Sequence, residues 1–115
     1  MRRMPPVRAQ VGGVMRKAAR KDASQTRKVG RLRERGLKVA ITHRLGSGMP
    51  DILVGGIRDG VPTLLWVEIK EQGGSLTPDE RAFFDEWAGL PVIVAHWAAD
   101  VLDWFGMPVT KDDLV

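Results

Sequence analysis

Four short apolar runs along the chain have the length and composition of β-strands: residues 37–43 (LKVAITH), 51–56 (DILVGG), 63–70 (TLLWVEIK) and 91–97 (PVIVAHW). In the first run, apolar residues recur at every second position, which is typical of a strand with one buried side. The later runs are almost continuously apolar, as in strands that are covered on both faces. Asp59-Gly60 lies between the second and third runs and predicts a tight hairpin turn.

A long helical pattern, residues 15–35, precedes the strands. It consists mainly of good helix formers and carries a thin apolar stripe (Val14, Ala18, Val29 and Leu32). Gly36 follows at the position where a helix C-cap favours glycine. Three residues near position 22 are good N-caps, so a main helix that restarts there is a second interpretation (Asp22, Ser24 and Thr26).

A second helix is marked by its start signals. Thr77 is a good N-cap, Pro78 suits the first helical position, and Glu80 completes a capping box. We expect this helix to run to Trp87 or Ala88 and to stop at Gly89, with an apolar side formed by Phe83, Phe84 and Trp87. Residues 98–106 (AADVLDWFG) predict a short third helix, followed by a tail.

The element order is therefore helix, three strands, helix, strand, helix. This order predicts the α/β class, with a small mixed sheet and helices on its faces. The length of 115 residues fits one domain. We expect residues 1–13, which hold two prolines and two glycines, to form a flexible basic arm, and residues 14–115 to form the single domain.

Composition excludes several classes of protein. The chain has no cysteine, so disulfide frameworks and thiolate zinc sites are excluded. No apolar run approaches the roughly 18 residues that a membrane-spanning helix needs. The N-terminal residues have no apolar core of the kind that secretory signals carry, so we expect a cytoplasmic protein.

The net charge of +4 hides a strong asymmetry. Residues 1–36 contain 12 Lys/Arg and two acidic residues, whereas residues 37–115 contain six Lys/Arg and 12 acidic residues. The first part therefore has a net charge of +10 and the second of −6. Such a division favours a polyanionic partner that binds the basic segment, although a solvated basic helix is the simpler alternative.

Two acidic residues and a lysine form the most informative constellation. If the second and third strands pair around Asp59-Gly60, Gly56 lies opposite Thr63, and Asp51 then lies opposite Glu68. Lys70 shares a strand face with Glu68. Two adjacent carboxylates repel unless a proton or cation lies between them, and oxygen ligands suit Mg²⁺ or Mn²⁺. The alternative is an ordinary pair of charges on an exposed strand.

These residues resemble the PD-(D/E)XK nuclease superfamily. The resemblance rests on GMPD ending at Asp51, VEIK ending at Lys70 and GGSLTPDE ending at Glu80. Within the superfamily, the chain is similar to the VRR-NUC (virus-type replication-repair nuclease) domains and more distantly to archaeal Holliday-junction resolvases, over roughly residues 20–97. The resemblance implies a restriction-endonuclease-like αβββαβ core and metal-dependent hydrolysis of DNA phosphodiester bonds.

The resemblance also implies roles for individual residues. Asp51 and Glu68 would hold Mg²⁺ or Mn²⁺ together with the backbone carbonyl of Ile69, and Lys70 would be the catalytic lysine. The family usually has an acidic residue or glutamine on the first helix, for which Gln25 and Asp22 are the candidates. Relatives usually have glutamine at the place of Glu80, so this residue either reaches the site or serves only its capping box.

The expected partner is DNA, branched DNA such as a four-way junction in particular, in a prokaryotic or phage context where the protein would associate with the nucleoid. Phosphate contacts are expected from the basic helix and from the glycine-rich loop after the first strand (Arg16, Lys17, Arg20, Lys21, Arg27, Lys28, Arg31, Arg35, Arg44, Ser47 and Gly48). A homodimer is also implied, and four aromatic residues are candidates for its interface or for the core (Trp87, Trp97, Trp104 and Phe105).

The roles of two histidines and the function of the protein each allow more than one interpretation. His43 and His96 stand near strand ends, where they are either polar end residues or metal ligands. The alternative to a nuclease is a catalytically weak or inactive DNA-binding protein that keeps the nuclease fold. A basic accessory protein with fortuitous acidic residues is a third interpretation.

Overall fold

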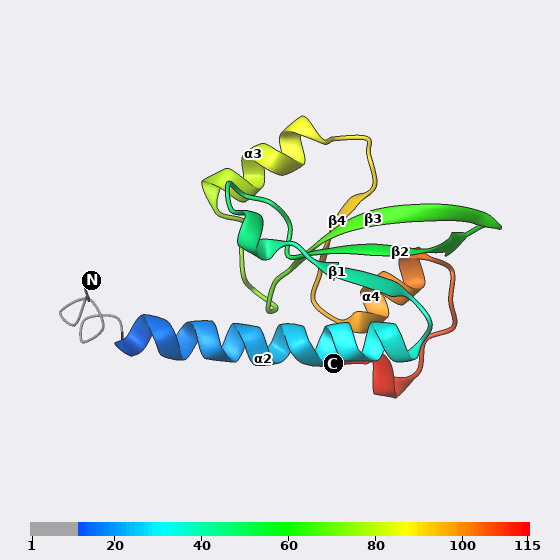
Figure 1. The fold of residues 1–115 in the computed structure, drawn as a ribbon, viewed down its shortest axis with the longest axis horizontal. Coiled ribbons are helices and arrows are strands. Elements are labelled where there is room, and N and C mark those ends of the chain that lie inside the picture. The colour runs from blue at the N-terminus through cyan, green and yellow to red at the C-terminus, as the bar shows by residue number, and fades with distance from the viewer. Residues whose placement is uncertain (1–11) are drawn as a thin grey trace, which may run out of the picture.

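The computed structural model describes the backbone of residues 12–115 and the side chains of residues 22–115. The described residues form the helices α2 (Gly12–Glu34), α3 (Pro78–Glu86) and α4 (Ala98–Trp104) and the strands β1 (Lys38–Ile41), β2 (Ile52–Arg58), β3 (Val61–Ile69) and β4 (Val92–Ala95), which are labelled in Figure 1. Two short 3₁₀ helices complete the fold: η1 (His43–Leu45) and η2 (Lys111–Asp113). The predicted α/β class and element order are confirmed.

The sheet is mixed, with the strand order β1-β2-β3-β4. β2 runs antiparallel to both β1 and β3, and β4 runs parallel to β3 after the crossover through α3. Asp59 and Gly60 form the two-residue turn between β2 and β3, with φ angles of 52° and 79°. Positive φ at both central residues is what a type I′ turn requires, so the hairpin predicted from Asp-Gly is confirmed.

Helix α2 is one continuous helix. The structure includes Gly12 and Gly13 in it, so the helix begins before the predicted residue 15, and the predicted restart near residue 22 is wrong. At its other end Gly36, at a φ of 93°, donates its N–H to Arg33, and Leu37 donates to Leu32, which is the expected glycine cap. Residues 1–11 lie outside the described part of the chain. No helix in the part described is both long enough and apolar enough to span a bilayer.

The two faces of the sheet have different covers. On one face Leu65, Val67 and Ile69 of β3 are buried in the core, which includes residues of α2 and α4 (Val29, Leu32, Val101, Leu102 and Phe105). On the other face Trp66 contacts Phe83 of α3 and Trp87, the C-cap residue of this helix, at ring-centroid distances of 6.0 and 6.1 Å. In Figure 1, α3 and α4 accordingly lie on opposite sides of the sheet. Both faces of β3 are therefore covered, as its almost continuously apolar run predicted.

The C-terminal tail is fixed to α2 by a buried carboxylate. The side chain of Asp113 is 0% exposed, and its oxygens lie 2.6 Å from Arg31 Nε and 2.7 Å from Arg35 Nη1. The backbone N–H of Thr110 and both guanidinium groups hold the pKa of Asp113 well below its usual range, against the effect of burial. Arg31 and Arg35 therefore bind the tail, and the phosphate contacts expected of them stay predictions.

Candidate active site

Asp51 and Glu68 lie side by side at the end of the β2–β3 pair that is remote from the hairpin turn. Gly56 pairs with Thr63 and Ile52 pairs with Val67, so the same register sets Asp51 opposite Glu68. Their exposed fractions are 3% and 1%. Residues directly opposite each other in a sheet share a face, here the face that α3 covers. The hairpin register from which we predicted the juxtaposition of the two carboxylates is confirmed.

The backbone and side chain of Asp51 are both held in place. Its carbonyl oxygen accepts hydrogen bonds from the N–H groups of Thr42 (2.8 Å) and His43 (3.1 Å), where β1 turns into η1. Its side chain Oδ2 accepts a 2.8 Å hydrogen bond from the N–H of Ile69. The position of this carboxylate is therefore defined by two neighbouring strands, which gives the rigidity that a catalytic or metal site requires.

The N–H of Ile69 also reveals the direction of its carbonyl. In a β-strand, the N–H and C=O of one residue point to the same side, and those of the next residue point to the other. Since the N–H of Ile69 is directed at Asp51, its carbonyl also faces the Asp51 side of β3. The N–H of Lys70 faces the opposite side and donates to Ala95 of β4 at 3.1 Å. This direction suits the ligand role that the resemblance implies for the Ile69 carbonyl.

Lys70 is surrounded by carboxylates. Its Nζ lies 2.8 Å from Glu80 Oε1 and 3.7 Å from Glu68 Oε2. Burial opposes the charged form of this lysine, but the hydrogen bond to Glu80 and the nearby carboxylates outweigh it and raise the pKa of Lys70. The side chain therefore presents a positive charge beside the acidic pair.

Glu80 completes the capping box of α3 and also contacts Lys70. Its Oε1 accepts a 2.8 Å hydrogen bond from the N–H of Thr77 and completes the capping box of α3, and the same oxygen contacts Lys70. Burial would raise the pKa of Glu80, but the hydrogen bonds from Lys70 and Thr77 outweigh it and lower this pKa to about 2. The first turn of α3 is thereby coupled to the site.

The first helix contributes a glutamine whose partner is a histidine. Gln25 is buried, and its Nε2 lies 3.3 Å from His43 Nδ1, so this contact links α2 to the turn that fixes Asp51. Asp22, the acidic candidate, is exposed. Neither residue supplies a carboxylate from α2 to the site.

A buried polar network next to the site was missed by sequence reasoning. Ser24 Oγ donates to Glu71 Oε2 at 3.0 Å and accepts from Lys28 Nζ at 2.7 Å. Burial lowers the pKa of Lys28, partly offset by the charge of Glu71. This network connects α2 to the residue that follows Lys70. The spacing of Ser24 and Lys28 by four residues was its only sequence signal.

The expected DNA contacts fall into three groups. The side chains of Arg16, Lys17, Arg20 and Lys21 lie outside the described part, whereas Arg27, Arg44 and Ser47 are exposed, as a phosphate contact requires. Lys28 is buried on Ser24 and so does not fit the prediction. Gly48, at a φ of 78°, packs so tightly against α3 that an added Cβ would lie 2.3 Å from the carbonyl oxygen of Asp79. Its role is therefore close packing of the loop on the helix.

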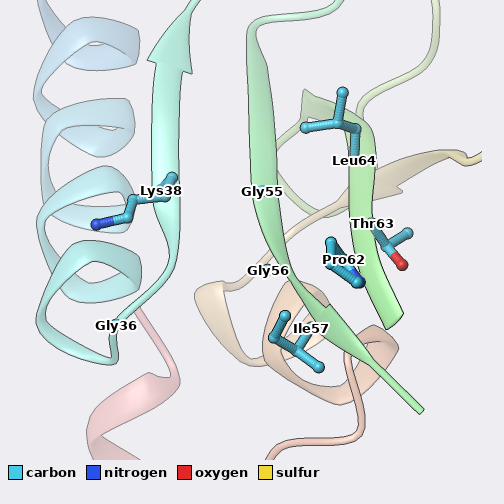
Figure 2. Close-up of a pocket in the computed structure, with 8 residues that line it drawn as sticks. All are labelled: Gly36, Lys38, Gly55, Gly56, Ile57, Pro62, Thr63 and Leu64. Atoms are coloured by element: carbon cyan, nitrogen blue, oxygen red, sulfur yellow. The ribbon is translucent and has the colours of Figure 1, made fainter. Parts of the chain in front are cut away.

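A shallow apolar depression of about 430 Å³ lies at the opposite end of the β2–β3 pair. Figure 2 shows Gly55 and Gly56 along its floor, with side chains around them (Lys38, Ile57, Pro62, Thr63 and Leu64). Gly56 is five positions along the chain from Asp51, which corresponds to about 17 Å along an extended strand. The depression is therefore separate from the acidic pair.

The groups that could hold a metal ion here are the carboxylates of Asp51 and Glu68 and the backbone carbonyl of Ile69. Among the described residues, no group of three or more His, Cys, Asp or Glu side chains is arranged to hold a metal ion. Two carboxylates and a carbonyl, with water completing the shell, nevertheless match the oxygen ligands that Mg²⁺ prefers. Comparison with known proteins gave no matching family model, curated protein or solved structure.

Proposed function

We propose that the protein is a metal-dependent DNA endonuclease with a restriction-endonuclease-like core. The observation that carries the proposal is the register that pairs Asp51 with Glu68 and directs the Ile69 backbone at Asp51, with Lys70 on the same face as Glu68. Two buried carboxylates at a strand end are costly unless a cation or a proton compensates their charges. A site that binds Mg²⁺ or Mn²⁺ accounts for that arrangement.

The residues of the site have separate tasks in this proposal. Asp51, Glu68 and the Ile69 carbonyl would hold the cation, which supplies positive charge opposite the charge that develops on the scissile phosphate. Lys70, held by Glu80 and Glu68, would contribute a second positive charge to the same phosphate. Exposed Arg27 and Arg44 and the basic part of α2 would bind the DNA backbone without reading its sequence.

A DNA-binding protein without catalytic activity is the second candidate. It is favoured by one observation: the first-helix residue Gln25 contacts His43, and α2 supplies no carboxylate to the site. Such a protein would bind DNA but leave it intact in both Mg²⁺ and Mn²⁺.

Cleavage of a substrate panel distinguishes the two candidates. Labelled linear duplex, flap, splayed-arm and four-way-junction DNA would be incubated with the protein in Mg²⁺, in Mn²⁺ and in EDTA. We expect cutting that requires the cation and is fastest on a branched substrate. Binding to all substrates without any cutting would contradict the proposal and support the second candidate.

A further inference from the structure

At the end of β4, a side chain takes the place of a backbone N–H as the hydrogen-bond partner of the Lys70 carbonyl. In a parallel pair, a strand residue that donates to residue j−1 of its neighbour accepts from residue j+1. Lys70 donates its N–H to Ala95, so the regular ladder would bring the N–H of Trp97 to the carbonyl of Lys70. The N–H of Trp97 instead donates to Asp100 Oδ2 at 3.0 Å, at the start of α4.

His96 supplies the missing donor. Its Nδ1 lies 2.7 Å from the carbonyl oxygen of Lys70. A carbonyl oxygen only accepts hydrogen bonds, so Nδ1 carries the proton in this contact. The backbone N–H of His96 donates to Asp100 Oδ2 at 2.8 Å, which fixes the residue from which the ring projects. The ring thus extends the ladder by one bond beyond the last paired residue of β4.

This bond holds the peptide unit that follows Lys70. With its N–H on Ala95 and its carbonyl on His96, Lys70 is fixed on the β4 side of β3. Ile69, whose backbone alternates with that of Lys70, is thereby kept facing Asp51. A loose end of β3 would let both the Ile69 carbonyl and the Lys70 side chain turn away from the acidic pair.

We infer that His96 is a positioning residue for the proposed nuclease site: through the carbonyl of Lys70 it fixes the direction of the Ile69 carbonyl and of the Lys70 side chain. This inference rests on the proposed function. It assigns His96 no contact with DNA or metal. Partners of this kind around metal ligands typically change metal affinity or activity by about 10- to 100-fold when they are removed.

Two substitutions test this role. His96→Ala removes the donor, whereas the side-chain amide of His96→Asn offers an N–H close to the position of Nδ1. We expect kcat to fall by about 10- to 100-fold in His96→Ala, with KM for DNA within about twofold of the wild type, and to recover largely in His96→Asn. Thermal unfolding of both variants measures their folding. Unchanged kcat in a folded His96→Ala, or equal loss in a folded His96→Asn, would overturn the inference.

A spectroscopic measurement separates this inference from the proposed function. Nitrogen-15 NMR of the wild-type imidazoles at pH 8.5 identifies which ring nitrogen of His96 carries the proton. We expect a proton on Nδ1. Its absence there would overturn the inference even if the protein cuts DNA. A wild type that binds DNA but cuts none of it, with the proton on Nδ1, would instead contradict the proposed function and with it the positioning role.

Discussion

Lys70 contacts two carboxylates at unequal distances, and the closer one belongs to α3. Glu80 lies 2.8 Å from Lys70 Nζ and Glu68 lies at 3.7 Å. The capping box fixes Glu80, so the lysine is oriented by a helix start rather than by its own strand. Where the family that the sequence resembles usually has a glutamine, this chain has a charged group, and the charge has a measurable consequence for stability.

Glu80→Gln keeps a side chain able to complete the capping box but removes the charge beside Lys70. Because the pKa of Glu80 is lowered from 4.5 to about 2 in the folded protein, its charge stabilises the fold above pH 4.5, by at most about 3 kcal/mol. That stability is lost as the pH falls from 4.5 towards 2. Denaturant unfolding from pH 7 to pH 2.5 should show the wild type more stable than Glu80→Gln at pH 7, with the difference shrinking below pH 4.5.

A constant difference in unfolding free energy over this pH range would contradict the contact between Glu80 and Lys70. Glu86→Gln, an exposed substitution at the end of the same helix, serves as the control and should stay close to the wild type.

Individual residues were predictable where a local rule determines their position. Asp59-Gly60 defines the hairpin turn, and the register that follows brings Asp51 to Glu68 without further information. The contacts of Gln25 with His43 and of Ser24 with Glu71 join segments that are distant in sequence. No periodicity or turn signal encodes such contacts, so the basic residues of α2 were all expected to face solvent.

The loop between η1 and β2 and the first turn of α3 depend on each other. Gly48 has a positive φ of 78°, and an added Cβ would lie 2.3 Å from the backbone oxygen of Asp79. Gly46, two residues earlier in the same loop, has a similar φ of 73° but open space around it. Comparing an alanine substitution at each glycine therefore separates the free-energy cost of backbone strain from the cost of displacing α3.

Gly46→Ala should lose about 1 kcal/mol of unfolding free energy, because only the left-handed backbone conformation is disfavoured. Gly48→Ala should lose more than this and should also lower the cleavage rate by about tenfold or more, since α3 must move and carries Glu80 with it. Unfolding in urea and single-turnover cleavage measure the two effects. Equal stability and activity in both variants would mean that the loop does not position α3.

The elements themselves followed largely from sequence signals. The caps at Gly36 and Thr77 and the apolar runs placed the helices and strands to within a few residues. The tail was less predictable, because η2 is held by the buried Asp113 and its two arginines rather than by an apolar pattern. β1 is similar: Ile41 was expected on the buried side, but it is 44% exposed although its partner Ile52 is buried, because β1 is an edge strand of the sheet.

The whole molecule leaves apolar side chains exposed at the hairpin end of the sheet. Ile57, Val61 and Leu64 are 58%, 58% and 61% exposed, and Ile57 and Leu64 border the depression in Figure 2. Three of the four aromatic residues first considered for a dimer interface make contacts within the chain: Phe105 is in the core, Trp87 packs on Trp66 and Phe83, and Arg58 lies over the ring of Trp104 at 3.9 Å. The homodimer stays a prediction, and we expect it to use the exposed apolar residues of the hairpin.

Leu64→Lys tests this surface. If two chains pair through the hairpin, a buried lysine at the centre of the interface should shift the protein from dimer to monomer, with an increase in the dissociation constant of at least about tenfold. Leu90→Lys changes an equally exposed leucine, 55% exposed, in the loop after α3 and should leave the dimer intact. Sedimentation or light scattering gives the mass. A monomeric wild type, or a Leu64→Lys variant that remains dimeric, would contradict this interface.

Single-turnover cleavage by Asp51→Asn tests the central claim most directly. Asparagine keeps the size of the side chain and an oxygen that can accept from the N–H of Ile69, but it removes the charge that the proposed metal site requires. We predict that cleavage of a branched DNA in Mg²⁺ falls by about 100-fold or more while the affinity for the same DNA stays within about threefold. Cleavage at the wild-type rate by the folded variant, or cutting by the wild type that persists in EDTA, would contradict the account.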